Sequence, residues 1–212
     1  MEFRPIVEAD LDAFDVAFRG EEGATPYQWF GFTPTVALRE ALRTRGLLAG
    51  ADNMLAVTVN GELAGRVEWM ERRWGRRDTS LCWEIAIGLL PAWRGRGVGT
   101  LAQRELVRYL FTHTRVERVQ ATTDPENMAE IRCLEKVGFH REGRVRRAQW
   151  RGGRWHDQLL YSLLRDELHA ELPDESHVEV PQQLRADMGG LVGGEPQQQR
   201  VLATRGEGAD PG

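Results

Sequence analysis

The sequence predicts one mixed α/β domain with a mostly antiparallel sheet of about seven strands, flanked by about four helices. The predicted elements run in the order strand, two helices, three strands, helix, strand, helix and two strands, which is typical of a mixed sheet and not of a doubly wound parallel one. The chain has 212 residues, enough for one domain with a proper core. Its composition, 41% apolar and 28% charged, is that of an ordinary globular protein.

The N-terminal part predicts one short strand and two helices. Residues 3–7 have the pattern of a strand, and Asp10 is the predicted N-cap of the helix that follows. Three glycines and one proline in residues 19–32 predict a loop. Thr33-Pro34 then predicts the start of a second helix, which we expect to stop at Gly46.

A hairpin and a central strand come next. Residues 54–59 and 62–71 are predicted to form a hairpin, because Asn60-Gly61 between them suits a type I′ turn. Residues 83–90, WEIAIGLL, form an apolar run and predict the central strand of the sheet.

A glycine-rich segment at 94–100, here named the glycine turn, joins this strand to a helix that reaches about residue 111. The first backbone N–H groups of a helix lack partners, and the helix dipole adds positive charge there, so such a turn suits phosphate oxygens. Gly95, Gly97 and Gly99 remove side chains that would keep a phosphate from the backbone. The apolar residues of the helix fall on one face: Val98, Leu101, Ala102, Leu106 and Leu110.

The spacing of these glycines excludes two common phosphate-binding motifs. A dinucleotide-binding fingerprint needs G-x-G-x-x-G. Here the glycines fall at alternate positions, and Thr100 stands where the third glycine of the fingerprint would be. A P-loop needs a lysine before its Ser or Thr, and the only lysine of the chain is Lys136.

The remaining part of the domain predicts a strand, a helix and a hairpin. Residues 116–123 read as a strand, and the helix after Asp124-Pro125 should end at Gly138. Two further strands flank residues 151–154, RGGR. From Pro173 onward, repeated glycine, proline and glutamine predict a disordered tail, so we divide the chain into a domain at 1–170 and a tail at 171–212.

Two motifs resemble those of a known superfamily. Arg94-x-x-Gly97-x-Gly99 between a strand and a helix resembles the acyl-CoA pyrophosphate loop of the GNAT N-acetyltransferases, and residues 127–139, NMAEIRCLEKVGF, are similar to their later helical block. Residues 142–167 resemble the final hairpin of the RimJ/RimL-like branch, which includes ribosomal-protein N-terminal acetyltransferases. The resemblance covers about residues 1–170.

This resemblance implies a GNAT fold in which the central strands splay apart, with acetyl-CoA as cofactor and coenzyme A as product. The strand before the glycine turn would hold the pantetheine arm through its free backbone groups, and Asn127 would bond the arm from across the splay. The implied cofactor-binding residues are Ile87, Gly88, Leu89, Arg94, Gly95, Arg96, Gly97, Val98, Gly99, Thr100 and Asn127.

Two glutamates are candidates for the general base. Glu84 shares a strand face with the small residues Ala86 and Gly88, which leave room for a ligand, and its position matches a glutamate often found in the RimJ/RimL-like branch. The alternative interpretation makes Glu84 a structural residue, and Glu68 on the preceding hairpin is then the candidate base. No general acid can be named, because Glu130 and Leu134 stand where many relatives have serine or tyrosine.

The implied reaction moves acetyl from acetyl-CoA directly to a primary amine within a ternary complex. The acceptor is a protein N-terminus or a small cationic amine, either a metabolite or an antibiotic. Two alternatives stay open, namely another acyl donor and a non-catalytic acyl-CoA-binding module. Acidic and aromatic residues of the first helical pair, the sheet and the final hairpin would surround the acceptor: Asp12, Asp15, Glu21, Glu22, Tyr27, Trp29, Trp69, Trp83 and Trp150.

Charge and cysteine content narrow the choice of partners and compartment. The net charge is -4, and the acids of the tail account for it, so the predicted domain is electrically balanced and we expect neither nucleic acid nor membrane as a partner. Cys82 and Cys133 are too few for a disulfide framework and are expected to be buried.

The histidines lack metal-ligand spacing, so we expect no metal. No signal peptide or apolar membrane span is evident, which predicts a cytoplasmic protein. Monomer and homodimer both stay open.

Overall fold

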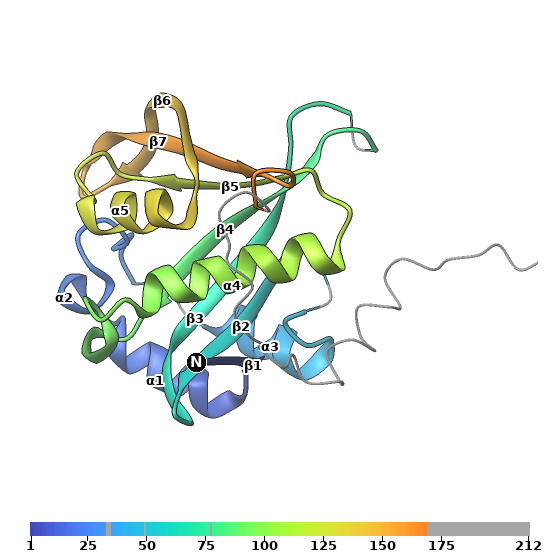
Figure 1. Ribbon diagram of the computed structural model, residues 1–212. Helices are drawn as coiled ribbons and strands as arrows, with labels where there is room; N and C mark the ends of the chain where they lie inside the picture. Colours follow the sequence, from blue (N-terminus) through green and yellow to red (C-terminus); the bar gives the residue numbers. More distant parts are fainter. Residues whose placement is uncertain (33–34, 49, 77, 169–212) are drawn as a thin grey trace, which may run out of the picture. The chain divides into compact units, whose positions relative to one another are not determined.

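Seven strands form one sheet in the order β1-β2-β3-β4-β5-β7-β6 (Figure 1). The computed structural model describes residues 1–32, 35–48, 50–76 and 78–168. The predicted helix start at 33–34 and the predicted tail lie outside the described residues. In chain order the elements are β1 (Glu2–Pro5), α1 (Glu8–Ala17), α2 (Glu21–Ala24), α3 (Val36–Thr44), β2 (Asp52–Val59), β3 (Glu62–Arg73), β4 (Leu81–Leu89), the 3-10 turn η1 (Pro91–Trp93), α4 (Val98–His113), β5 (Arg118–Thr123), α5 (Met128–Val137), β6 (His140–Arg151) and β7 (Arg154–Leu164).

The sheet is antiparallel at every neighbouring pair except the central one. β4 and β5 run parallel, and they pair at only two positions, Trp83 with Val119 and Glu84 with Gln120. On its other side β4 pairs with β3 along its whole length, from Leu81 to Leu89. The two central strands therefore splay apart toward their carboxyl ends, which confirms the predicted mixed sheet and its splay.

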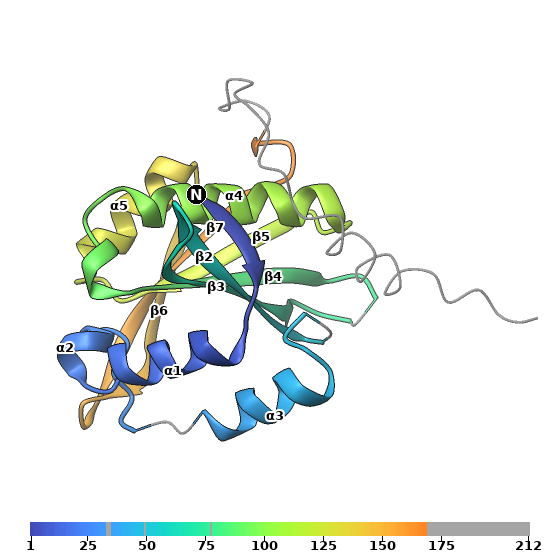
Figure 2. The same ribbon diagram turned by 90° about the horizontal axis from the view of Figure 1, so that it is seen from below.

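Helices cover both faces of the sheet. Figure 2 shows α4 and α5 on one side of the strands and α1 and α3 on the other. Under α4 and α5 the core is built on fully buried Leu106, Leu110 and Leu134. Under α1 and α3 a second apolar cluster includes Leu11, Phe14 and Met54. The sheet thus has an apolar contact on each face, and its central strands lie between two helical layers.

Local turn chemistry agrees with the predictions. Asn60 and Gly61 both have positive φ, 52° and 83°, as a type I′ turn requires. Gly138 ends α5 in the left-handed region, with φ 101°. The hairpin β6–β7 turns at Gly152 and Gly153, which also have positive φ. The predicted strands and helices around these turns are confirmed to within a few residues.

The structure differs from the predictions in three local details. α2, a single helical turn, forms inside the predicted loop, so the described residues form five α-helices, in agreement with the prediction of about four. Asp10 is not the N-cap, because α1 already begins at Glu8; its carboxylate accepts hydrogen bonds from the Val7 N–H and from Arg4. Leu101 is 43% exposed, so it lies at the edge of the buried face of α4.

Within the described residues, no helix is both long and apolar enough to span a membrane.

Candidate functional site

A cavity of about 1240 Å³ lies where β4 and β5 separate. One wall, here named the turn side, comprises residues from 86–89 of β4, the glycine turn, and α5 with its cap at 127–136. The opposite wall, here named the loop side, comprises residues from 14–19, from 24–32 and Arg66 with Glu68 of β3, together with Thr35 and Leu38. The helices of the turn side, α4 and α5, lie on one face of the sheet, and α1 of the loop side lies on the other (Figure 2). A ligand between the two walls therefore contacts both.

The edge of β4 that faces β5 is free beyond the two paired residues. From Ile85 to Leu89 this strand has β3 on one side and no paired strand on the other. Apart from the Leu89 carbonyl, which accepts a hydrogen bond from Arg94, the backbone groups on that edge are available to an extended amide-containing ligand, which would pair with them as another strand does. Ile87, Gly88 and Leu89 all line the cavity, where the sequence places the cofactor arm.

The glycine turn depends on left-handed backbone at two residues. Gly95 and Gly97 have φ of 70° and 80°, a region in which other residues are strained, and Gly97 is the residue that caps α4. Val98 begins the helix. A side chain on Gly99 would make only ordinary contacts, the nearest at 3.5 Å from Leu89 Cδ1. The first two glycines are therefore required by the backbone, and they leave the amino end of a 16-residue helix open.

Arg94 ties the turn to its surroundings. Its Nε donates to the Leu89 carbonyl at 3.0 Å, and its guanidinium also bonds the Gly23 carbonyl of the loop side. Burial lowers the pKa of this guanidinium from its ordinary value. Gly95, Gly97, Gly99 and Thr100 line the cavity with Arg94, but the cavity wall does not include Arg96 or Val98. The guanidinium of Arg96 stacks on Trp93 instead.

Asn127 opens α5 and faces the cavity. Its Oδ1 accepts a hydrogen bond from the Glu130 N–H at 3.3 Å, so it acts as the helix cap. This bond uses the acceptor of the side chain. The amide donors can serve an oxygen of a ligand in the cavity, so the capping and the predicted cofactor contact are compatible.

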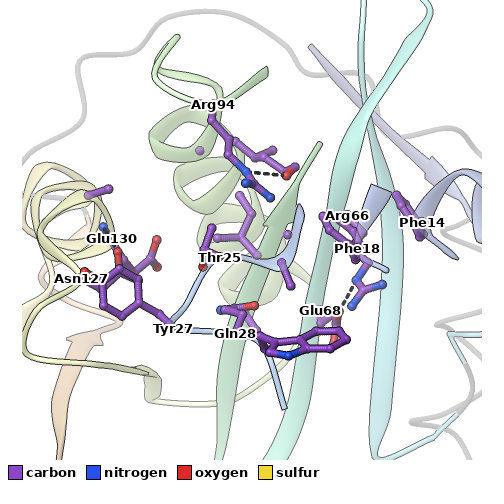
Figure 3. Close-up of a pocket in the computed structure, with 18 of the residues that line it drawn as sticks. Phe14, Phe18, Thr25, Tyr27, Gln28, Arg66, Glu68, Arg94, Asn127 and Glu130 are labelled. Atoms are coloured by element: carbon purple, nitrogen blue, oxygen red, sulfur yellow. Dashed lines mark hydrogen bonds and ion pairs between the residues drawn. The ribbon is translucent and has the colours of Figure 1, made fainter. Parts of the chain in front are cut away.

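Glu130 projects into the cavity from the first turn of α5 (Figure 3). The Gln103 amide of α4, itself buried, donates to its two carboxyl oxygens at 3.0 and 3.2 Å. Withdrawal from bulk solvent raises the pKa of the Glu130 carboxyl to about 7, and the Gln103 hydrogen bond opposes that rise. Sequence reasoning placed Glu130 at an unusual position but gave no sign of its buried partner.

The two candidate bases differ in their access to the cavity. Glu68 lines the loop side and forms an ion pair with Arg66 at 2.5 Å (Figure 3). Glu84 lies at the last paired position of β4 and β5 and is not among the cavity-lining residues. Its carboxylate accepts hydrogen bonds from Arg72 at 3.0 Å and from Gln120 at 2.9 Å. This placement does not test the predicted role of Glu84. As a base, Glu84 would have to reach a ligand from outside the cavity wall, whereas Glu68 lies in that wall.

A buried charge pair fixes the loop side. Arg151 of β6 donates to Asp124 at 2.6 Å and to the Tyr27 carbonyl at 3.2 Å, and both charged side chains are almost fully buried. The Tyr27 hydroxyl also donates to the Glu126 carbonyl at 3.0 Å. Burial alone would raise the pKa of Asp124, but the Arg151 and backbone hydrogen bonds hold that pKa below its ordinary value. Arg151 thus joins the final hairpin, the end of β5 and the cavity wall.

Two of the four acids expected around the acceptor, Asp12 and Asp15, form ion pairs. Arg39 of α3 forms ion pairs with Glu8, Asp12 and Asp15, at 2.8, 2.9 and 2.7 Å. The guanidinium of Arg66, which pairs with Glu68, lies 5.3 Å from the ring centres of Phe14 and Phe18.

Of the residues expected around the acceptor, Asp15, Tyr27 and Trp29 line the cavity; the wall does not include Asp12, Glu21, Glu22, Trp69, Trp83 or Trp150. Trp69 and Trp83 are buried in the core instead, and Trp150 is exposed on the hairpin beside Trp155.

Neither cysteine has the surroundings of a nucleophile. Cys82 is buried, as predicted, and burial raises the pKa of its thiol. Cys133 is only half-buried, in contrast to the prediction, and lines the cavity, where it accepts a hydrogen bond from Thr100 at 3.3 Å. Among the described residues, no three His, Cys, Asp or Glu side chains are grouped so that they could hold a metal ion.

Comparison with known proteins agrees with this architecture. The sequence profile of a family described as "Acetyltransferase (GNAT) domain" matches residues 1–140. An aminoglycoside N(6')-acetyltransferase type 1 from Klebsiella pneumoniae is 45% identical over 51 residues, which is 24% of this chain and 25% of that protein. Two further curated relatives, the N-acetyltransferases YnaD and YjcK of Bacillus subtilis, are matched over 50% and 44% of their own lengths, so the chain spans about half the length of each.

Solved structures show the same fold at low sequence identity. A spermidine N-acetyltransferase from Vibrio cholerae, in complex with CoA and spermine, superposes with a TM-score of 0.66 at 20% identity, over 79% of this chain and 96% of that one. A ribosomal-protein-alanine N-acetyltransferase from Brucella melitensis gives a TM-score of 0.64 at 21% identity, over 77% and 99% of the two chains.

Proposed function

The chain belongs to the GNAT acetyltransferase family, and we propose that it transfers an acetyl group from acetyl-CoA directly to a primary amine. The observation that carries this proposal is the free edge of β4, which runs from the two-residue pairing with β5 to the glycine turn at the start of α4. An anionic group at the turn and an extended amide arm along the strand together describe the chemistry of coenzyme A.

The cofactor would lie along the turn side. Its pyrophosphate meets the backbone N–H groups after Gly97, where the helix dipole favours negative charge. Its pantetheine arm extends along Ile87 to Leu89, with the Asn127 amide across the splay on the same turn side. This arrangement brings the thioester to the middle of the cavity, between the turn side and the loop side.

The amine must lose a proton for the transfer to proceed. An α-amino group, with a pKa of about 7.7 to 8.0, is partly neutral near pH 7.5, whereas a lysine-like amine needs roughly 4 kcal/mol for deprotonation. The cavity position of Glu68 favours it as the direct base, and Glu84 stays a predicted base that would act through water. Neither cysteine has an activating partner among the described residues, which supports direct transfer and not an acyl-cysteine intermediate.

The loop side favours an acceptor with one positive charge and an apolar or aromatic neighbour. Asp15 and Glu68 are already paired with arginines, so further cationic groups of a polyamine or aminoglycoside would meet few unpaired carboxylates. The wall instead presents aromatic rings, among them Tyr27, Trp29 and Phe30. A peptide N-terminus fits this chemistry, and we propose it as the acceptor class.

Binding and turnover with defined ligands test both parts of the proposal. The purified full chain is titrated with acetyl-CoA, coenzyme A and NADH by calorimetry. Thiol release is then measured with acetyl-CoA and three acceptors, namely short peptides with free N-termini, spermidine and kanamycin. We expect binding of acetyl-CoA but not of NADH, and faster release with peptides.

Lack of acetyl-CoA binding would overturn the enzyme assignment. If acetyl-CoA binds but releases no coenzyme A thiol with any of the acceptors, the alternative of a non-catalytic acyl-CoA-binding module is favoured. Faster release with spermidine or kanamycin would overturn the acceptor class alone. We further propose residues 1–170 as the catalytic domain; the tail, the oligomeric state and the cytoplasmic location stay predictions from the sequence.

A further inference from the structure

We propose that Glu130 is the general acid of this reaction and protonates the coenzyme A sulfur as it leaves. The inference rests on the proposed function, because it requires a thioester on the turn side. The sequence alone left the acid unassigned, since Leu134, one helical turn after Glu130, has no proton to give. Leu134 is fully buried in the core, whereas Glu130 reaches the cavity.

Glu130 is free of the structural role that its position usually has. A glutamate at the third residue of a helix commonly reaches back to the N–H of the capping residue. Here the Asn127 N–H donates to the Asp124 carbonyl at 2.9 Å instead. The Glu130 carboxyl turns away from the cap, and Figure 3 shows it pointing into the cavity beside Asn127.

The surroundings of Glu130 favour a neutral carboxyl. Gln103 from α4 is its hydrogen-bonding partner among the described residues, and that partner carries no charge. The Oε1 of Gln103 is buried without a partner in the described part of the chain. If the amide turned by half a rotation, this oxygen would accept the proton of a neutral Glu130, so the pair suits both protonation states.

The other charged and titratable groups of the cavity lie mostly on the turn side, with Glu130 itself. Arg132, Cys133 and Lys136 of α5, Arg94 of the turn and Tyr27 of the loop share the cavity with Glu130. Burial dominates the shift of the Glu130 pKa to about 7. The helix dipole at the first turn of α5 favours the charged form. A carboxyl near pH 7 is therefore partly protonated and can deliver its proton.

The proton transfer is chemically balanced. The amine nitrogen forms a bond to the thioester carbonyl carbon, the carbon–sulfur bond breaks, and its electron pair goes to sulfur. The Glu130 proton joins that sulfur and gives the coenzyme A thiol, while the proton released by the amine passes to the base and then to solvent. Glu130 regains a proton from water. Because a thiol has a pKa of about 8.5, transfer from a carboxyl near 7 is favourable.

The first test compares Glu130→Gln with the wild type and with Glu135→Gln, a substitution on the same helix outside the cavity lining. Loss of a general acid should lower kcat by about 100-fold or more and leave the acetyl-CoA Kd within about threefold. It should also remove the fall in kcat above pH 7, because glutamine does not titrate. Glu135→Gln should behave as the wild type.

A different pattern would overturn the role. If Glu130→Gln weakens acetyl-CoA binding while kcat is unchanged, Glu130 merely holds the cofactor arm. An unchanged kcat with an unchanged Kd would also refute the proposal. These results differ from failure of the proposed function, in which the wild type itself would bind no acetyl-CoA.

A second readout needs no turnover. A carboxyl whose pKa is raised in the folded state binds more protons folded than unfolded, so stability falls as pH rises from about 4.5 to 7. The denaturant midpoint of the wild type, relative to that of Glu130→Gln, should therefore be lower at pH 8 than at pH 5. An equal difference at both pH values would show that Glu130 is ionised throughout, and this would overturn its role as an acid.

Discussion

The two walls of the cavity are built in different ways. The turn side depends on backbone conformation within two short stretches of chain, at 86–100 and 127–136. The loop side depends on side chains that meet across long separations, as with Arg151 and the Tyr27 carbonyl, 124 residues apart. The first kind of wall is set by local sequence and the second only by the completed fold. A change on one side should therefore alter cofactor and acceptor binding separately.

Gly97→Glu should break the turn side and have the largest effect. The new side chain would bring a negative charge beside the proposed phosphate site, at a residue whose φ of 80° suits only glycine. We expect acetyl-CoA affinity to fall by more than about 1000-fold, measured by calorimetry, which corresponds to about 4 kcal/mol. Gly61→Glu is the matched control, because Gly61 has φ 83° and equally open space. Retained affinity in Gly97→Glu would contradict the proposed phosphate site.

Comparing Glu68→Gln with Glu84→Gln should show which of the two glutamates is the general base. With a lysine-like amine, we expect Glu68→Gln to lower kcat/KM by about 100-fold near pH 7, and raising the pH should restore much of the loss. Glu84→Gln should cost less than about tenfold, because its carboxylate lies outside the cavity wall. Glu71→Gln, on the same strand as Glu68, serves as control. The reverse order would assign the base to Glu84, as first predicted from the sequence.

Arg151→Met should break the loop side. It leaves the Asp124 carboxylate buried without its partner, which costs about 3–5 kcal/mol of stability at pH 7. It also removes the hydrogen bond from Arg151 to the Tyr27 carbonyl, so the acceptor KM should rise about tenfold while the acetyl-CoA Kd changes little. Steady-state kinetics and urea unfolding measure the two effects. An unchanged acceptor KM would show that Arg151 supports only the fold.

The pH dependence of the Arg151→Met variant follows from Asp124. In the wild type its folded pKa lies below the unfolded value, so its stabilisation is present above about pH 4 and is lost as the pH falls further. Without Arg151, the folded pKa of Asp124 rises from its wild-type value, because only the Glu126 N–H and His156 still oppose burial. Asp124 therefore stabilises the variant less than the wild type at pH 7, and the deficit of the variant should shrink as the pH falls from 7 to 4.

Arg39→Met should have the smallest effect of these substitutions, and it tests the acids beside the loop side. It releases Asp12 and Asp15, which would then be free to attract a second cationic group. We expect kcat/KM for spermidine to rise about threefold and that for a peptide to stay unchanged, because electrostatics at an exposed site are weak. No gain with spermidine would show that these acids lie outside the acceptor path.

The turn side was predictable because its features are local. Glycines at 95 and 97, the strand before them and Asn127 before the second helix each have a backbone reason to stand where they do. The loop side was not, because α2 is a single turn in a glycine-rich stretch and Arg151 gives no local sign of its partner Asp124. Glu130 combines both cases: its position was evident, but its contact with Gln103 required the packing of α4 on α5.

The two-residue pairing of β4 with β5 has a consequence for the lifetime of the protein. The sheet is nearly divided into two separate sheets, and a bound coenzyme arm would extend the junction by supplying the hydrogen bonds that β5 does not. The coenzyme would then be a component of the fold as well as a substrate. At a concentration of 100 times its Kd it would add about 2.7 kcal/mol of stability. Protein made when acetyl-CoA is scarce would be degraded faster, so the amount of enzyme would follow the supply of its own substrate.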